Sequence, residues 1–199
     1  MATLNPSLAG SEGLQTLQTP ATALILADGQ SSDLAELLQG ARIPLTNLGS
    51  GHNPLAEIGS LLEAQRAAER PVDTLHLVCH GRPGAVRLSG RWIETADLVR
   101  ASQQLRQWRV KTIALWSCRT GQSADFTSLL SELTGATVFS SSEPVGACER
   151  ERVLKSEARE INLADIFFEV AIRDWGGQLA DSPIFDVANA VLSFRNPTR

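Results

Sequence analysis

Two side chains that can share a proton, His80 and Cys118, each follow directly on an apolar segment of strand-like composition. Residues 72–79 (VDTLHLVC) lead into His80, and residues 111–117 (KTIALWS) lead into Cys118. A thiol becomes an effective nucleophile when a neighbouring base takes its proton, and an imidazole titrates close to neutral pH. A helix predicted to begin near Gly121 would favour a thiolate further through its positive end. The spacing therefore indicates nucleophilic catalysis by a cysteine.

The order of these residues along the chain excludes two large groups of hydrolases. The chain has three histidines, all of which precede Cys118: His52, His76 and His80. In papain-like peptidases the cysteine comes first, and in α/β-hydrolases the histidine comes last. The α/β-hydrolase nucleophile also needs glycine two positions before and after it, where this chain has Trp116 and Thr120. What remains is a histidine followed by a cysteine, each at the end of a strand.

The segments around these residues alternate between predicted strands and predicted helices. Apolar runs bounded by turn residues predict five strands, over residues 22–28, 42–48, 72–79, 111–117 and 136–139. Helical periodicity predicts four helices, over residues 31–39, 54–70, 94–108 and 121–134, and Ser89-Gly90 predicts a small hairpin over residues 85–93. Such alternation is typical of a three-layer α/β/α sandwich with a mostly parallel central sheet. Consecutive elements are usually neighbours and ligands bind beyond the carboxyl ends of parallel strands, so His80 and Cys118 are expected to lie side by side.

The pattern is weaker in the last quarter of the chain. Residues 149–160 carry dense charge of both signs and are predicted to form a solvated helix or loop. Residues 162–175 are predicted to form an amphipathic helix that covers a sheet edge. We expect one domain over residues 21–180, preceded by a flexible leader over residues 1–20 and followed by a tail over residues 181–199.

Composition excludes several classes of function. A chain of 199 residues suits a single domain, and a net charge of −4 gives no reason to expect nucleic acid or an anionic membrane as a partner. No apolar run is long enough to span a bilayer, and the N-terminus lacks the basic and apolar regions of a signal peptide. Three cysteines without such a signal favour reduced thiols in the cytoplasm, or export by a route that needs no N-terminal signal peptide.

The other histidines and cysteines are predicted to be structural or exposed. His76 lies four residues before His80 on a strand, roughly 13 Å away, which is too far for both to bind one metal ion. We therefore expect no metal and no cofactor. Cys79 points to the opposite face of the strand from His80 and is predicted to be a core thiol, whereas Cys148 lies in a loop. His52 follows the second strand, where it either lines the cleft or is an exposed loop residue.

The succession of a strand with His80-Gly81 and a strand with Cys118 resembles clan CD cysteine peptidases: caspases, gingipains, clostripain, legumain and separase. The stretches LHLVCHGRPGAVRLSGRWI, TIALWSCRTG and LLSELTGATVFSSSEPVG more specifically resemble a bacterial domain of unknown function, number 4347. That family often lies near the N-terminus of very large secreted or surface proteins. The resemblance covers about residues 22–146.

The resemblance implies a role for each matching residue. His80 would be the general base or proton donor and Cys118 the nucleophile, and the backbone N–H groups of Gly81 and Cys118 would form the oxyanion hole. Members of the family often have Gly before the cysteine and Asp after it, where this chain has Ser117 and Arg119. Arg119 would either favour the thiolate or obstruct a pocket.

Three residues are predicted to bind a substrate. Asp28 ends the first strand, where clan CD peptidases often carry a charged residue of the pocket for the residue before the cut bond. Asp28 would then select Lys or Arg, and the alternative is a turn-forming role in the Asp-Gly dipeptide. Ser140 and Ser141 follow the fifth strand and would form another wall of the cleft.

The expected function is that of a caspase-like cysteine endopeptidase, a hydrolase that cleaves a peptide bond of a protein, or of this chain itself, through a thioester acyl-enzyme. The charged segment offers basic residues as self-cleavage sites or simply as a solvated face: Arg150, Arg152, Lys155 and Arg159. The first alternative is an inactive pseudopeptidase that binds a peptide or a partner domain in the same cleft. The second is a cysteine-dependent hydrolase or transferase with a non-peptide substrate.

Overall fold

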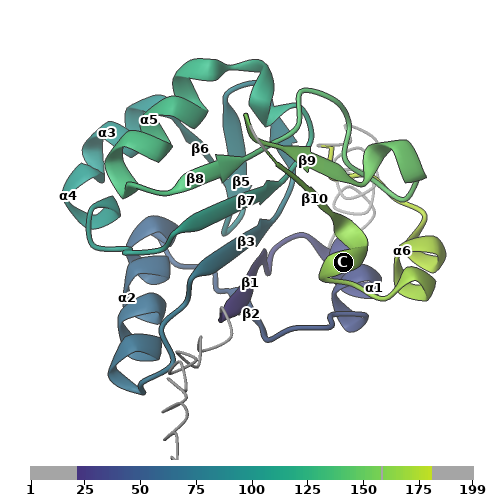
Figure 1. Ribbon diagram of the computed structural model, residues 1–199, viewed down its shortest axis with the longest axis horizontal. Coiled ribbons are helices and arrows are strands. Elements are labelled where there is room, and N and C mark those ends of the chain that lie inside the picture. The colour runs from purple at the N-terminus through teal and green to yellow at the C-terminus, as the bar shows by residue number, and fades with distance from the viewer. Residues whose placement is uncertain (1–21, 158, 181–199) are drawn as a thin grey trace, which may run out of the picture.

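The computed structural model describes residues 22–157 and 159–180, so the predicted leader and tail lie outside the described residues. An all-parallel sheet of five strands forms its centre: β1 (Ala23–Asp28), β2 (Leu45–Leu48), β3 (Thr74–Val78), β7 (Thr112–Trp116) and β8 (Thr137–Phe139). Their order across the sheet is β2-β1-β3-β7-β8, and helices cover both faces (Figure 1). The predicted α/β/α sandwich is confirmed.

Two apolar clusters pack on opposite faces of this sheet, because alternate strand residues point to opposite sides. The face that carries Leu75 and Leu77 packs against four helices: α2 (Pro54–Ala67), α3 (Thr95–Arg100), α4 (Ser102–Leu105) and α5 (Ala124–Thr134). The face that carries Val78 and Trp116 packs against two helices and a small hairpin: α1 (Ala35–Gln39), α6 (Glu169–Trp175), β9 (Val153–Lys155) and β10 (Glu160–Asn162). Figure 1 shows these two groups of elements on either side of the central strands.

Local signals explain where several elements begin and end. The side chain of Asn53 accepts the N–H of Ala56 at 3.1 Å and so caps α2, and α5 ends at Gly135, which has a φ of +72°. The predicted hairpin turns at Ser89 and Gly90, both with positive φ. It forms a separate antiparallel sheet: β4 (Gly81–Arg82), β5 (Ala85–Leu88) and β6 (Arg91–Glu94).

Three predicted elements differ from those observed. The helix predicted over residues 94–108 is divided at Ala101 into α3 and α4. Residues 149–157 and 159–160 form a 3-10 turn, β9 and the start of β10 in place of a solvated helix or loop, because Leu154 is buried and Lys155 exchanges two backbone hydrogen bonds with Ser140. In the segment 162–175 only α6 is an α-helix.

The described residues also include four short 3-10 helices: η1 (Ser32–Leu34), η2 (Thr120–Gln122), η3 (Glu149–Glu151) and η4 (Leu163–Asp165). The helix predicted to begin near Gly121 therefore opens with η2, and α5 itself begins at Ala124. In the described part of the chain, no helix has both the length and the apolar character needed to cross a membrane.

Candidate active site

The strands β3 and β7 lie side by side and end level with each other. Val78 pairs with Trp116 in the parallel register, so His80 and Cys118 each follow two residues beyond that pair. Gly81 lies directly against the second loop, because a Cβ atom built there would come within 2.6 Å of the Cys118 carbonyl oxygen. Glycine permits so close an approach because it has no Cβ atom. The loops that carry the predicted catalytic residues are thus packed backbone against backbone.

Two backbone N–H groups from these loops point at a single acceptor. The N–H of Gly81 and the N–H of Cys118 both donate to the carbonyl oxygen of Leu179, at N···O distances of 3.0 and 3.1 Å. Fixed N–H donors that meet at one oxygen are what enzymes use to stabilise the oxyanion of a tetrahedral intermediate. The acceptor belongs to the segment after α6, which the sequence did not connect with the site.

His80 is only 5% exposed, and its two ring nitrogens differ in environment. Its Nε2 lies 3.1 Å from Oδ1 of Asp33, a residue of η1. A carboxylate oxygen accepts hydrogen bonds, so the imidazole tautomer that suits this contact carries its proton on Nε2 and a lone pair on Nδ1. That Nδ1 is buried and has no hydrogen-bond partner. The imidazole therefore has one nitrogen fixed by an acid and the other free to accept a proton.

Asp33 was not predicted as a site residue. Trp175 is the last residue of α6, and its Nε1–H donates to the Asp33 carbonyl oxygen at 2.9 Å. This hydrogen bond helps to hold η1 in place. The only signal in the sequence is an acidic residue shortly after β1, beyond the carboxyl end of a strand. β1 is the direct neighbour of β3 in the sheet, and this topology brings the carboxylate to His80.

Cys118 is 2% exposed, and its sulfur lies against the backbone of Val145. The N–H of Val145 donates to Sγ at 3.1 Å, and the thiol donates to the Val145 carbonyl oxygen at 3.4 Å. Burial raises the pKa of the Cys118 thiol, although the Val145 N–H and the charge of Arg119 act in the opposite direction. Within the described residues no hydrogen bond joins His80 to Cys118. The raised pKa favours the neutral form of the Cys118 thiol.

Ser117 and Arg119, the residues on either side of Cys118, have different surroundings. Ser117 is fully buried, and its hydroxyl lies 2.7 Å from that of Thr120, so it is part of the packed loop. Arg119 is exposed and has a φ of +57°, and its N–H donates to the Glu143 carbonyl oxygen at 3.1 Å. Its charge lowers the pKa of Cys118, which is the thiolate-favouring role, but burial has the larger effect.

The segment after α6 runs along one wall of the site like an added strand. The N–H of Leu179 donates to the Val145 carbonyl oxygen at 2.8 Å, and the N–H of Ala147 donates to the Gly177 carbonyl oxygen at 3.0 Å. These bonds form an antiparallel bridge of the kind that joins neighbouring strands. The wall at Val145 and Ala147 was not predicted, although the segment that precedes it was.

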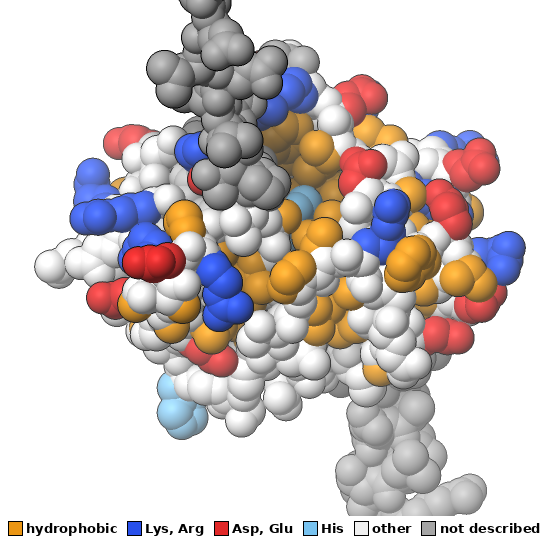
Figure 2. Space-filling view, turned by 60° about the horizontal axis from the view of Figure 1, so that its bottom comes forward, with side chains coloured by type: hydrophobic (Ala, Val, Ile, Leu, Met, Phe, Trp, Pro, Cys, Tyr) orange, Lys and Arg blue, Asp and Glu red, His pale blue; other side chains and the backbone are white. Residues whose placement is uncertain are grey.

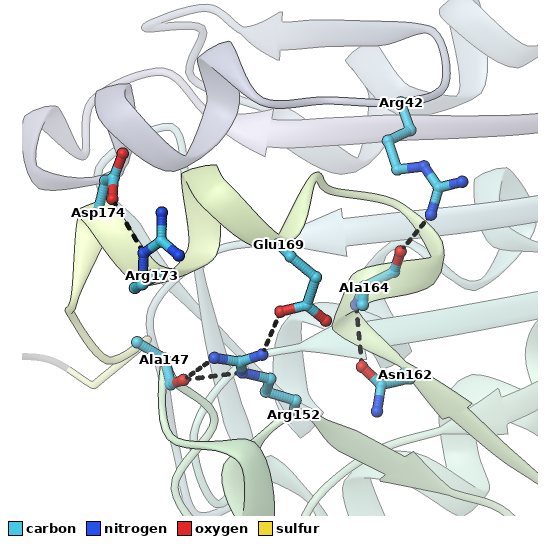
Figure 3. A network of polar contacts seen from close by, with 8 residues as sticks. All are labelled: Arg42, Ala147, Arg152, Asn162, Ala164, Glu169, Arg173 and Asp174. Atoms are coloured by element: carbon cyan, nitrogen blue, oxygen red, sulfur yellow. Dashed lines mark hydrogen bonds and ion pairs between the residues drawn. The ribbon is translucent and has the colours of Figure 1, made fainter.

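An ion-paired arginine holds this wall in place (Figure 3). Nε and Nη2 of Arg152 donate to the Ala147 carbonyl oxygen at 2.8 and 2.5 Å, and Nη1 pairs with Glu169 of α6 at 2.6 Å. A guanidinium presents its N–H donors in a rigid fork, so the carbonyl of Ala147 has a fixed position. The N–H of Ala147 also donates to the Gly177 carbonyl oxygen. Arg152 thus connects α6 to the wall against which residues 177–180 lie.

Asp28 is fully buried, and its carboxylate is used inside the fold. It accepts the Ser31 hydroxyl at 2.9 Å and the N–H groups of Gln30 and Gly90 at 3.2 and 3.3 Å. These contacts support the turn-forming alternative. A substrate-binding role for Asp28 stays a prediction, to which these contacts lend no support.

Ser140 and Ser141 lie in the loop after β8, as expected. Ser140 pairs with Lys155, and the carbonyl of Ser141 accepts the N–H of Gly121, so the loop is attached both to β9 and to η2 after Cys118. In the described ranges neither serine is hydrogen-bonded to residues 177–180. Their role in substrate binding stays a prediction, and the wall that contacts this segment lies further along the same loop.

The remaining histidines and cysteines lie apart from this arrangement. Cys79 is fully buried in the cluster on the opposite face from Cys118, and burial raises its pKa far above the ordinary range. Cys148 and His52 are exposed. Figure 2 shows one histidine projecting from the surface and another recessed in a hollow lined by hydrophobic side chains. His76 accepts a hydrogen bond from Trp116 inside the sheet.

No cluster of three or more metal-binding side chains (His, Cys, Asp or Glu) occurs in the described part of the chain.

Comparison with known proteins gives one match. Residues 24–179, which are more than half of the chain, match the family described as Domain of unknown function (DUF4347). No curated protein matches the chain, and no solved structure matches it either. The matched residues include both strand ends, the wall at Val145 and the segment up to Leu179. The chain therefore belongs to the DUF4347 family of domains of unknown function.

Proposed function

We propose that this protein is a cysteine peptidase of the caspase-like kind, with Cys118 as the nucleophile and His80 as the general base. The observation that carries the proposal is the convergence of the N–H groups of Gly81 and Cys118 on one carbonyl oxygen. The same two loops supply the imidazole and the thiol. An oxyanion site, a base and a nucleophile at one edge of a sheet are the parts that acyl transfer requires.

The reaction would begin with a neutral thiol, because burial raises the pKa of Cys118. His80 accepts the thiol proton at Nδ1 while Sγ attacks the carbonyl carbon of the peptide bond. The carbonyl oxygen becomes an oxyanion that the N–H groups of Gly81 and Cys118 stabilise. His80 then gives the proton to the leaving nitrogen, and the C–N bond breaks. Water hydrolyses the resulting thioester and restores the thiol.

Asp33 would act as a positioning residue for His80. Its carboxylate keeps the proton on Nε2, and this leaves the lone pair on the nitrogen that must accept the thiol proton. The same carboxylate would stabilise the imidazolium that forms during attack, as the acid of a catalytic triad does. This assignment gives the site an acid, a base and a nucleophile from the segments that follow three adjacent strands, β1, β3 and β7.

A second candidate function is a pseudopeptidase that binds a peptide in the groove that residues 177–180 occupy, between the wall at Val145 and Ala147 and the N–H groups of Gly81 and Cys118. Two observations favour it: residues 177–180 lie in the groove, and the described residues include no hydrogen bond between the thiol and the imidazole. A binding module needs the wall at Val145 and Ala147 and the two N–H donors, but it needs no activated thiol. The two candidates therefore differ in the reactivity of Cys118.

That reactivity can be measured with peptidyl acyloxymethyl ketones that carry leucine, lysine or aspartate before the reactive carbonyl. The full chain is incubated with each probe, and the labelled residue is identified by mass spectrometry. A peptidase is expected to be labelled at Cys118 with at least one probe, and His80→Ala is expected to abolish this labelling while the circular dichroism spectrum is retained.

Cys148 provides an internal control because it is exposed and lies outside the site. Iodoacetamide, which needs no peptide groove, should modify Cys148 at the same rate in the wild-type chain and in His80→Ala. If every ketone probe labels Cys118 slowly, and if His80→Ala leaves these labelling rates unchanged, the peptidase is contradicted and the binding module is favoured.

A further inference from the structure

We propose that the chain cuts itself between Leu179 and Ala180, and that residues 177–180 lie in the groove as the substrate. This inference rests on the proposed peptidase function, because Cys118 and His80 would perform the cut. It adds the position of the cleaved bond and the kind of side chain that the site accepts before it. The proposed self-cleavage site is therefore Leu179, and not one of the basic residues of the charged segment 149–160.

The backbone of this segment is held on both sides of the bond in question. Before the bond, the N–H of Leu179 donates to Val145 at 2.8 Å, and its carbonyl oxygen receives the N–H groups of Gly81 and Cys118 at 3.0 and 3.1 Å. After the bond, Ala180 forms a parallel bridge with Gly81. An extended peptide with its carbonyl oxygen between two fixed donors has the orientation that a peptidase needs for attack.

Cys118, the proposed nucleophile, and Leu179 are hydrogen-bonded to the same backbone carbonyl group. Both the Leu179 N–H and the Cys118 thiol bond to the Val145 carbonyl oxygen, at 2.8 and 3.4 Å. The carbonyl oxygen of Leu179 is bonded to the N–H of Cys118 itself. Cys118 and Leu179 are thus hydrogen-bonded to each other and to the same Val145 carbonyl oxygen, and such proximity is the main requirement for an intramolecular reaction.

The side chain of Leu179 indicates what the site accepts. It is fully buried, in the same apolar cluster as Val78, Trp116, Cys118 and Val145. An apolar pocket favours leucine and disfavours a charged side chain, because an unpaired charge would lose its hydration there. Asp28, the residue expected to select Lys or Arg, uses its carboxylate on Ser31, Gln30 and Gly90 instead.

Glycines let the chain enter the groove. α6 ends at Trp175, and Gly176 has a φ of +58°, which reverses the chain direction. Gly177 lies so close to the Trp175 ring that a Cβ atom would be 2.7 Å from it. On the wall at Val145 and Ala147, a Cβ atom at Gly146 would lie 2.8 Å from the side chain of Gln178. The sequence at these positions therefore suits the docking of this segment.

The bonds and protons of the proposed cut can be followed step by step. A bond forms between Sγ of Cys118 and the carbonyl carbon of Leu179, the bond from that carbon to the nitrogen of Ala180 breaks, and the thiol proton passes through His80 to that nitrogen. Water then adds its hydroxyl to the carbonyl carbon and returns a proton to the sulfur. The products are a chain that ends in the Leu179 carboxylate and a fragment that begins with the amine of Ala180.

The test is intact-mass spectrometry of the full chain over time after purification. We expect the mass to change to that of residues 1–179, with a rate constant that does not depend on protein concentration because the contacts are intramolecular. Cys118→Ala and His80→Ala should remain whole. Leu179→Lys should be cut at least 100-fold more slowly, whereas the matched control Val170→Lys should be cut normally, because Val170 is 51% exposed and lies on α6, outside the segment 177–180.

Parallel labelling with the leucine ketone separates the failure of this inference from that of the proposed function. Labelling of Cys118 in the wild-type chain or in Leu179→Lys, with no cut at Leu179 in the wild-type chain, would overturn self-cleavage and leave the peptidase intact. The absence of both labelling and cutting would overturn both. A cut that persists in Cys118→Ala, or that falls after Arg150, Arg152, Lys155 or Arg159, would overturn the inference as well.

Discussion

The middle and the carboxyl end of β3 each hold a buried histidine, and the two differ in how their ring nitrogens are satisfied. His76 stacks on Trp116 with ring centroids 6.3 Å apart, and its Nδ1 accepts the Trp116 Nε1–H at 3.0 Å. Burial lowers the pKa of His76 to about 4, although the charge of Asp165 acts in the opposite direction. His80 has Asp33 on one nitrogen and no partner on the other.

This difference shows how to distinguish a structural histidine from a reactive one. Inside a sheet both strand neighbours are fixed, so a polar ring atom must find its partner there or lower the stability of the fold. At a strand end the ring faces loops, and a buried nitrogen without a partner is available to accept a proton or to bind a substrate. Changes at the strand end are therefore expected to reduce activity, and changes at the middle to alter stability.

The largest expected effect is that of Asp33→Asn on activity. Asparagine can donate its amide N–H to Nε2, which would move the ring proton to Nδ1 and remove the lone pair that accepts the thiol proton. We expect the rate of Cys118 labelling to fall on the order of 10²- to 10⁴-fold. The midpoint of the pH–rate profile should also shift, which a purely structural role would not cause.

Urea unfolding provides the other half of this test, because the free energy of unfolding should change by less than about 1 kcal/mol at a partly exposed site. Asp174→Asn is the matched control, since Asp174 is exposed and pairs with its neighbour Arg173. Equal labelling rates in wild type and Asp33→Asn would show that the contact between Asp33 and His80 is structural, like that of His76.

The next largest effect is expected for Gly81→Ala. A Cβ atom there would meet the Cys118 carbonyl oxygen and the Ser117 side chain at 2.6 Å, so the two loops must separate and one oxyanion donor is displaced. We expect labelling of Cys118 to slow by about 10²- to 10³-fold. Gly59→Ala in α2 is the control, because its nearest neighbour, Trp108, would lie 3.6 Å away. Retention of activity in Gly81→Ala would contradict the assignment of the oxyanion site.

The residues at these strand ends could be predicted because the signal is local. An apolar run that ends in His80-Gly81 and another that ends in Cys118 identify two strand ends, which are expected to be neighbours because consecutive elements usually lie side by side. The strand period also predicted that Cys79 points away from His80, and the two apolar clusters confirm the separation of Cys79 from Cys118. No knowledge of distant contacts was needed for either prediction.

The partners of these residues could not be predicted, because they depend on contacts between distant segments. Asp33 reaches His80 only because β1 pairs with β3, and Leu179 reaches Cys118 only because α6 packs beside α1 and turns at Gly176. The hairpin of β9 and β10 was missed for a different reason. Its charged side chains are solvated, and a single fully buried side chain, Leu154, attaches β9 to the core.

At the middle of β3 the expected effect is on stability and depends on pH. The pKa of His76 is lowered in the folded state from its ordinary value of 6.5 to about 4. Below pH 6.5 the unfolded chain therefore binds a proton that the folded chain excludes, and stability is lost progressively until about pH 4. The loss amounts to about 3 kcal/mol in total.

His76→Gln should remove this contribution, because glutamine cannot titrate but can still accept the Trp116 N–H through its side-chain oxygen. Urea unfolding at pH 7.5, 6 and 4.5 measures the difference, and the stability of the variant should fall less than that of wild type as the pH decreases. Labelling of Cys118 at pH 7.5 should stay within twofold of wild type. A large loss of activity in His76→Gln would remove the distinction between the two histidines.

The smallest expected effect comes from Arg152→Lys, which alters the wall without touching His80 or Cys118. Lysine keeps the charge beside Glu169 but cannot place two N–H donors on the Ala147 carbonyl oxygen, so the wall loses about one hydrogen bond. Net losses of this kind are about 1 kcal/mol, which corresponds to an approximately fivefold slower self-cleavage. Arg173→Lys is the control, because Arg173 is exposed on the same helix as Glu169.

If Arg152→Lys slows self-cleavage and labelling by a small leucine ketone equally, the wall acts on the catalytic loops. If self-cleavage alone slows, the wall acts by holding residues 177–180, as the hydrogen bond from Ala147 to Gly177 implies.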